Sequence, residues 1–152
     1  MFPVLKKRHG HNDHTGGLEH FIKTIQNKNI ELIAHLHCFY KKYFEKEYIG
    51  TPVTKEILEE NFKLNLSNMP IQISQNIIYL GEIPNLNDFE NREIISNYEN
   101  KNELVDDYVK DDSAIVYKSS KGLFIITGCS HSGICNIIEY AKKVCKKIEY
   151  MV

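Results

Sequence analysis

Cysteine is scarce in this chain, and no two cysteines form a Cys-x-x-Cys pair. The four cysteines are spread over the 152 residues, at Cys38, Cys129, Cys135 and Cys145. This spacing favours reduced thiols over a disulfide framework. The first residues also lack the long apolar core of a signal peptide. We therefore expect a reducing environment, with the cytoplasm as the location.

Long apolar runs and an excess of charge are missing as well. No run approaches about 18 residues, the length that a membrane-spanning helix needs. The formal net charge is -1, no long basic run occurs, and the nine tyrosines are dispersed rather than grouped for stacking on bases. These absences argue against a membrane or a nucleic acid as a partner and leave a small-molecule substrate as the expectation.

The pattern of apolar residues predicts alternating strands and helices in a single α/β domain over residues 1–152. The hydrophobic fraction of 42% is enough for one core. Apolar periodicity predicts helices at 18–25, 54–61 (with Thr54 as the N-cap) and 134–148, and strands at 30–36, 75–80, 114–117 and 123–127, the last two joined as a hairpin. Residues 87–112 are acidic and polar, and they are predicted to form a long surface loop.

The densest chemistry lies at residues 9–14, whose sequence is His-Gly-His-Asn-Asp-His. If residues 9–11 are extended, the two-residue period of a strand puts the His9 and His11 imidazoles on one face, where both reach a single divalent ion. Asp13 and His14 are adjacent, so a turn would aim their side chains apart, toward a second ion. The segment therefore predicts half of a two-metal site.

Two glycines, Gly16 and Gly17, follow the ligand segment. They are predicted to remove side chains where the backbone passes close to the site. Leu18 and Phe21 then begin the apolar stripe of a helix, so the ligands are expected on a strand-to-helix turn.

A second turn of the same kind, Gly128-Cys129-Ser130-His131-Ser132-Gly133, follows the strand predicted at 123–127. We predict His131 as a further metal ligand, and Cys129 either as a ligand or as a small core residue. Because α/β proteins build their sites at the carboxyl ends of strands, both turns are expected to contribute to one site.

The ligand segment resembles the metal signature of the metallo-β-lactamase superfamily, His-x-His-x-Asp-His at the end of a strand. Further ordered matches narrow the resemblance: Ala34-His35 with Phe39 and Lys42, Gly81-Glu82-Ile83-Pro84 with Asp88-Phe89-Glu90, Asp111-Asp112, and residues 128–134 with Asn136. Together they are similar to the 7,8-dihydropterin-6-methyl-4-(β-D-ribofuranosyl)aminobenzene 5′-phosphate synthase branch. The resemblance implies an α/β fold, a partial metallo-β-lactamase αββα sandwich.

The resemblance also implies chemistry. His9, His11, Asp13, His14 and His131 would hold two divalent ions, with zinc expected and iron or manganese as alternatives, since this ligand set suits several metals. The implied activity is that of a metal-dependent hydrolase, in which the ions activate a water and Asp13 orients it or takes its proton. A related transferase is the alternative reaction: in the synthase step, a ribosyl-aminobenzene displaces diphosphate from a pterin methyl carbon.

Two further alternatives stay open. One is a metal-binding fragment with weak or absent catalysis. The other is a nuclease-like member of the superfamily, which the lack of a basic surface disfavours.

The chain departs from the family pattern at both ends. The signature follows three cations, Lys6-Lys7-Arg8, whose side chains must reach solvent to avoid repelling a site for dications. The chain stops at Val152, before the strand turn that carries the family's last histidine, and Asn85 stands where the branch usually has arginine. We therefore expect a truncated sandwich that self-associates as a homo-oligomer or pairs with a complementing fragment.

The remaining conspicuous residues have open or structural roles. His20 is expected to face solvent from the first helix, and His37 is expected at the surface. His35 ends a strand and is a candidate either for the pocket or for a core or surface position. Asp111 and Asp112 precede a strand, where a turn or capping role and a place near the second metal are equally open.

Overall fold

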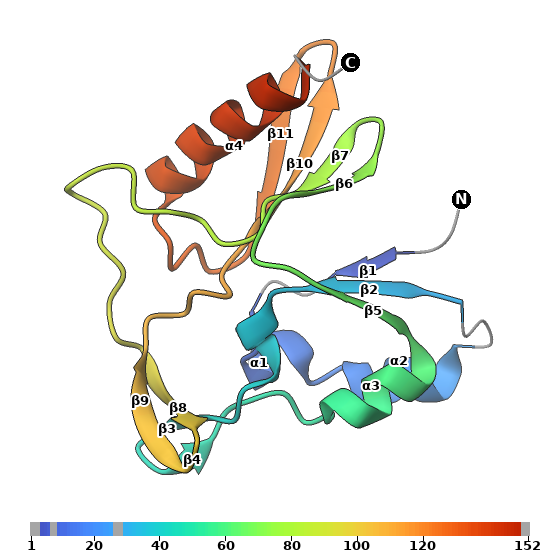
Figure 1. Ribbon diagram of the computed structural model, residues 1–152, viewed down its shortest axis with the longest axis vertical. Coiled ribbons are helices and arrows are strands. Elements are labelled where there is room, and N and C mark those ends of the chain that lie inside the picture. The colour runs from blue at the N-terminus through green and yellow to red at the C-terminus, as the bar shows by residue number, and fades with distance from the viewer. Residues whose placement is uncertain (1–3, 7–8, 26–28, 150–152) are drawn as a thin grey trace.

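The computed structural model describes residues 4–6, 9–25 and 29–149, and it confirms the α/β class. Two sheets lie face to face between helices, with α4 (Ile134–Glu149) on the outer side of one sheet and α2 (Leu18–Thr24) and α3 (Lys55–Asn61) on the outer side of the other (Figure 1). This succession of helix, sheet, sheet and helix is the predicted αββα sandwich. A third sheet of four strands lies beside it (Figure 1).

The first sheet is parallel and comes from the N-terminal half of the chain. Its strand order is β1-β2-β5, with β1 (Val4–Lys6), β2 (Glu31–Ala34) and β5 (Lys63–Leu66). Parallel neighbours need crossover connections, and these contain the helices α2 (Leu18–Thr24) and α3 (Lys55–Asn61). The helices and strand β2 enclose one apolar cluster, formed by Leu18, Ile30, Leu32, Val53, Leu58 and Phe62. The Thr54 side chain accepts a hydrogen bond from the Ile57 amide, which confirms the predicted N-cap.

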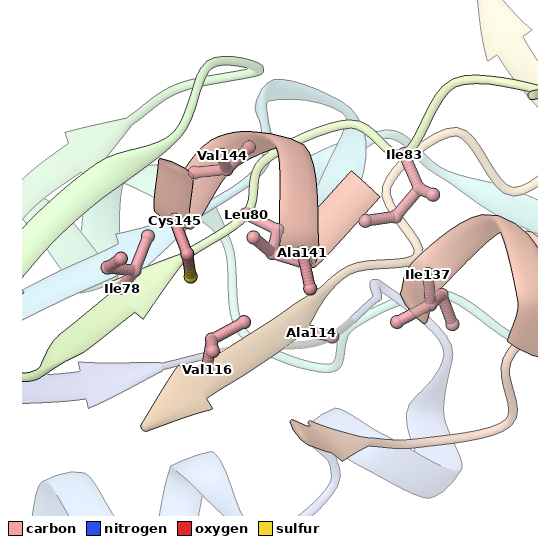
Figure 2. Packing of buried hydrophobic residues seen from close by; sticks show 9 residues of the cluster. All are labelled: Ile78, Leu80, Ile83, Ala114, Val116, Ile137, Ala141, Val144 and Cys145. Carbon is pink, nitrogen blue, oxygen red and sulfur yellow. The ribbon is translucent and has the colours of Figure 1, made fainter. Parts of the chain in front are cut away.

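The second sheet is antiparallel, and α4 (Ile134–Glu149) covers it. Its order is β11-β10-β7-β6, with β6 (Ile71–Ser74), β7 (Ile77–Tyr79), β10 (Ala114–Ser119) and β11 (Gly122–Thr127). Figure 2 shows the core between helix and sheet, where Ile137, Ala141 and Val144 of α4 meet Ile78, Leu80 and Val116. The predicted hairpin at 114–127 and the predicted C-terminal helix are therefore confirmed.

Part of the apolar face predicted for α4 is not buried. Ile134 is 47% exposed and Ile138 36% exposed. With Leu123 and Ile125 they line an apolar groove of about 510 Å³ between the helix and β11. β11 is the edge strand of its sheet, so the helix overhangs the sheet there and its apolar stripe extends past the last strand.

The prediction of a long surface loop at residues 87–112 is wrong. This stretch contains β8 (Ser96–Asn100) and β9 (Glu103–Asp107), which join β3 (Lys42–Phe44) and β4 (Glu47–Tyr48) in a sheet of order β4-β3-β8-β9. Lys101 and Asn102 both have positive φ, at 49° and 69°, as a two-residue hairpin turn of type I′ requires. The strands escaped detection because they are mostly polar and give no apolar alternation.

The ends of several elements also differ from the prediction. Residues 9–11, for which an extended strand was considered, belong to no strand, and residues 12–15 form a one-turn helix, α1 (Asn12–Thr15). The strand predicted at 30–36 stops at Ala34, because Leu36 begins a short 3-10 helix, η1 (Leu36–Phe39). The cluster Lys6-Lys7-Arg8 lies outside the residues whose side chains the structure describes.

The sequence predicted reduced cysteines and no membrane-spanning helix. None of the four cysteines is in a disulfide. Across the described residues, every helix is too short or too polar to cross a membrane.

Candidate metal centre

The two ligand turns predicted from the sequence meet in space. The first contains His9 to His14, after β1, and the second contains Cys129 and His131, after β11. His14 Nε2 lies 3.1 Å from Cys129 Sγ, across 115 positions of sequence. The two sheets thus bring their carboxyl-end turns together, as α/β sites require.

His9 lies at the centre of a histidine cluster. Its ring centroid is 4.1 Å from that of His14, 4.7 Å from that of His11 and 5.2 Å from that of His131. The rings of His11 and His131 are 6.4 Å apart. The four predicted histidines therefore surround one small volume.

His9 is fully buried, and among the described residues neither of its ring nitrogens has a hydrogen-bond partner. Burial, together with the neighbouring His11 and His14, lowers the pKa of His9 to about 3. Burial also lowers the pKa of His131, against the opposing effect of Asp112. Both rings are therefore neutral at physiological pH. A buried imidazole without a partner is costly, and a cation would use its lone pair, so this donor set fits a metal ion.

The side chains that could hold a metal ion form two groups within the described structure. One contains His9, Cys129 and His131, and the other contains Asp13, His14 and Cys129. In each group the ligand atoms lie within 4.8 Å of one another. The histidines and the aspartate predicted from the sequence thus divide between two positions, although His11 belongs to neither group.

The expectation that Asp13 and His14 point apart is wrong for this structure. Asp13 Oδ2 lies 3.2 Å from His14 Nε2. Both residues belong to the single turn of α1, and the Asp13 side chain is 63% exposed, so its carboxylate can bend toward the ring. The pair faces one position together instead of opening toward two.

His11 faces a polar pair on the third sheet. Its Nε2 lies 3.4 Å from Ser96 Oγ and 3.7 Å from Asp107 Oδ2. Burial would raise the pKa of Asp107, but the neighbouring His11 ring and the charge and close contact of Lys42 lower it below its ordinary value. Asp107 is therefore an anion that can fix the orientation of the His11 ring.

A buried lysine links the third sheet to the ligand segment. Lys42 Nζ lies 2.9 Å from Asp107 Oδ2 and 2.7 Å from Asp111 Oδ1. The other oxygen of Asp111 accepts a hydrogen bond of 2.7 Å from the Gly10 amide, between the first two candidate ligands. Burial lowers the pKa of Lys42, but Asp111 and Asp107 outweigh it and raise that pKa. A charged network thus holds the backbone of the ligand segment.

Gly10 is the glycine with the tightest surroundings at the site. A Cβ on Gly10 would lie 2.2 Å from the Cys38 carbonyl oxygen, so no side chain fits there. A Cβ on Gly16 would lie 2.8 Å from the Asn12 carbonyl oxygen, so the expected close approach of the backbone occurs there too, whereas a Cβ on Gly17 would meet nothing within 4 Å. The need for Gly10 could not be predicted from the sequence, because its neighbour Cys38 in η1 lies far along the chain.

Separate polar contacts hold the second turn. Asp112 Oδ2 accepts hydrogen bonds from the amide and the hydroxyl of Ser132, each at 2.8 Å. Glu90 accepts hydrogen bonds from the Cys135 and Asn136 amides, at 3.1 Å and 2.9 Å, and so caps the start of α4. The sequence left the roles of Asp111 and Asp112 open, and the structure shows that both fix turns beside the candidate ligands.

The remaining histidines lie outside the cluster. His20 is exposed, as predicted. His35 is buried with its Nδ1 accepting a hydrogen bond from the His37 amide and its Nε2 3.6 Å from Glu82 Oε2. His37 is half-buried and stacks on Tyr40 at a ring distance of 4.6 Å. His35 therefore supports η1 from the core side.

An open pocket of about 430 Å³ borders the second turn. Its walls come from the segment after β7 and from the turn itself, and they include Phe89, Glu93, Ile95, Cys129, Ser130 and His131. Phe89 is 71% exposed, so the pocket offers an apolar surface beside the candidate ligands. A small molecule could reach the cluster from this side.

Sequence reasoning missed the residues that position the ligands. Lys42 was noted only as a family match, and Asp107, Ser96 and Glu90 were not singled out for a role. One signal was available: an aspartate pair directly before a buried strand is shielded from solvent, so its carboxylates need hydrogen-bond donors or cations within the protein. The sequence does not reveal which residues these partners are, because Asp111 and Gly10 are 101 positions apart.

Two proteins of Methanocaldococcus jannaschii are similar to the chain in sequence. An uncharacterized protein is 37% identical over 144 residues, which cover 94% of this chain and 54% of that protein. A protein named 7,8-dihydropterin-6-methyl-4-(beta-D-ribofuranosyl)-aminobenzene-5'-phosphate synthase is 35% identical over 145 residues, which cover 90% of this chain and 49% of that protein. No protein-family model matches the chain.

A solved structure is similar in fold. The crystal structure of a metal-dependent hydrolase of the beta-lactamase superfamily matches with a TM-score of 0.74 at 25% sequence identity, over 91% of this chain and 50% of that one. The resemblance to this superfamily and to the synthase is therefore confirmed. The chain spans about half the length of the curated relatives it matches.

Proposed function

Because the chain has the metallo-β-lactamase fold and carries its histidine and aspartate pattern, we propose that it is a metal-dependent enzyme of this superfamily that acts on a small molecule. Hydrolysis is the reaction that we favour. The observation that carries the proposal is the buried, neutral His9, whose ring nitrogens lack partners at the centre of three further imidazoles.

Two divalent ions fit the two donor groups, and zinc is the ion that we expect first. His9 and His131 would serve one position, and Asp13 and His14 the other. His11 directs Nε2 toward Ser96 and Asp107, so its Nδ1 is the nitrogen left for a metal. Iron and manganese remain alternatives, because imidazole and carboxylate suit several first-row metals.

Divalent ions bound here would supply Lewis-acid chemistry, polarising a carbonyl or phosphoryl oxygen and making water more acidic. Asp13 would contribute the proton transfer. Its carboxylate is largely exposed on α1 and lies beside the donor cluster, so it can accept a proton and release it to solvent. The pocket lined by Phe89 and Ser130 would hold the substrate against this face.

A transferase reaction is the second candidate. It rests on the 35% identity to the protein named as the dihydropterin synthase, over 90% of this chain. In that reaction the same cluster would neutralise a departing diphosphate, and a ribosyl-aminobenzene would form the new bond to the pterin methyl carbon. A metal-binding protein without turnover is the third candidate.

Metal analysis tests the first part of the proposal. Purified protein, loaded with zinc and dialysed, should retain about two ions per chain, or one if the second position is weak. His9→Ala should lose most of this metal, because it removes the imidazole that contacts all the others. His20→Ala, which changes an exposed histidine on the neighbouring helix, is the matched control. Retention of less than about a tenth of an ion by the unchanged protein would refute the metal centre.

Activity assays separate the three candidates. Phosphodiester, lactone and thioester probes test hydrolysis, and a pterin diphosphate with ribosyl-aminobenzene phosphate tests the transfer. Metal-dependent turnover that Asp13→Ala abolishes would support an enzyme, and the substrate would identify the reaction. Stoichiometric metal binding with no turnover of any probe would support the metal-binding protein instead.

A further inference from the structure

Cys129 is the only residue shared by the two donor groups found among the described residues. Its sulfur lies within 4.8 Å of ligand atoms of His9 and His131 on one side, and of Asp13 and His14 on the other. The sequence left Cys129 open between a ligand and a core residue. It is exposed, so a core role does not account for its position.

We propose that Cys129 is a thiolate ligand common to both metal positions, so that one sulfur atom connects the His9–His131 position to the Asp13–His14 position. The inference rests on the metal centre proposed above and deepens it. It assigns the chemical class of the centre as a thiolate-bridged pair of soft or borderline divalent ions.

Charge balance supports a shared anion. Within the first group His9 and His131 offer imidazole nitrogens, which bring no negative charge, so a Cys129 thiolate is the one anionic donor for a dication there. Two dications a few ångströms apart repel each other strongly in a partly buried site. A negative sulfur between them offsets that repulsion, which neutral histidines cannot do.

The local backbone supports a fixed sulfur. Cys129 lies two residues after Thr127, the last residue of β11, and the next residue, Ser130, has a φ of 60°, in the left-handed region that most side chains avoid. Two hydrogen bonds define this turn: Ser130 Oγ lies 3.1 Å from Thr127 Oγ1, and the Gly133 amide donates to the Ser130 carbonyl at 2.9 Å. The turn thus presents the sulfur and the His131 ring toward the first ligand segment.

A thiolate ligand selects among metals. Thiolate is a soft donor that favours zinc over manganese or magnesium. The proposal therefore predicts that zinc or cobalt(II) outcompetes manganese at this centre. A centre with only imidazole and carboxylate donors would discriminate less.

Cobalt(II) spectroscopy tests the ligand. Cobalt-loaded protein should show a sulfur-to-cobalt charge-transfer band in the near ultraviolet, and Cys129→Ser should abolish it. Cys135→Ser is the matched control: Cys135 lies one turn further along, at the start of α4, outside both donor groups, and its removal should leave the band intact. Circular dichroism of each variant establishes that it is folded.

X-ray absorption on the unmodified zinc-loaded protein tests the sharing without any substitution. A bridging thiolate gives every zinc one sulfur neighbour at about 2.3 Å, whereas a terminal thiolate gives an average of half a sulfur per zinc in a two-zinc protein. Half a sulfur, no sulfur, or a charge-transfer band that survives Cys129→Ser would overturn the proposal while leaving the metal centre standing. Failure of the unmodified protein to bind any metal would instead refute the proposed function.

Discussion

Replacing Lys42 with methionine should destabilise the protein strongly. The Lys42 side chain is 1% exposed, and the carboxylates that it contacts, Asp107 and Asp111, are 5% and 0% exposed. Methionine fills a similar volume but leaves two buried anions facing each other. Removing one partner from a buried ion pair costs about 3–5 kcal/mol, because the remaining charge has lost its compensation.

That cost is large against the total stability of a domain, which is about 5–15 kcal/mol. In a chain of this size each kcal/mol shifts the melting temperature by about 2–4 °C, so Lys42→Met should lower it by about 6–20 °C. Thermal unfolding of the metal-free protein, followed by circular dichroism, measures the shift. Lys55→Met is the control, because Lys55 pairs with Glu59 at 3.2 Å on an exposed helix face and should matter little.

A second substitution tests whether the lost stability comes from an unpaired buried charge or from poor packing of the methionine. Adding Asp111→Asn to Lys42→Met removes one of the two unpaired anions and leaves an oxygen for the Gly10 amide. Part of the lost stability should therefore return. If Lys42→Met lowers the melting temperature by less than about 2 °C, or if the double variant is less stable than the single one, the account of this network is wrong.

Two further predictions concern the ligand segment itself. Gly10→Ala should destabilise the protein or displace the segment, because its Cβ would overlap the Cys38 carbonyl. Gly17→Ala should be tolerated, since its Cβ would meet no neighbour. Equal melting temperatures for the two variants would contradict this prediction. The metal-free protein should also lose stability in acid, because the pKa of His9 is about 3 in the folded state but near its ordinary 6.5 when unfolded. As pH falls below 6.5 the unfolded state takes up a proton that the folded state does not, which costs about 2 kcal/mol by pH 5. Denaturant titrations at pH 7 and pH 5 measure this, and His9→Gln should show a smaller loss than the unchanged protein.

The sequence located the candidate ligands because their chemistry is local. Three histidines and an aspartate occur within six residues, and His131 lies in a turn after an apolar strand, so residue type and strand order sufficed to expect them together. The apolar periodicity of β10, β11 and α4 likewise predicted that half of the sandwich.

The strands and residues that hold the candidate ligands in place could not be predicted in the same way. β8 and β9 are polar strands, and β3, the strand that pairs with β8, lies more than 50 positions earlier in the chain, so no periodic pattern reveals that pairing. Lys42 looks like any surface lysine in the sequence. Only the fold shows that it is buried between Asp107 and Asp111, since a long-range ion pair leaves no local trace.

The distance along the chain between the two turns also sets when the centre can form during synthesis. His14 and Cys129 are 115 positions apart, and a ribosome adds about 5–20 residues per second, so the first turn exists for on the order of ten seconds before the second is made. Through that interval the emerging chain offers its N-terminal histidines without the sulfur or the last imidazole. For the metal centre proposed above, the complete ligand set would therefore exist only after the second turn has been synthesised.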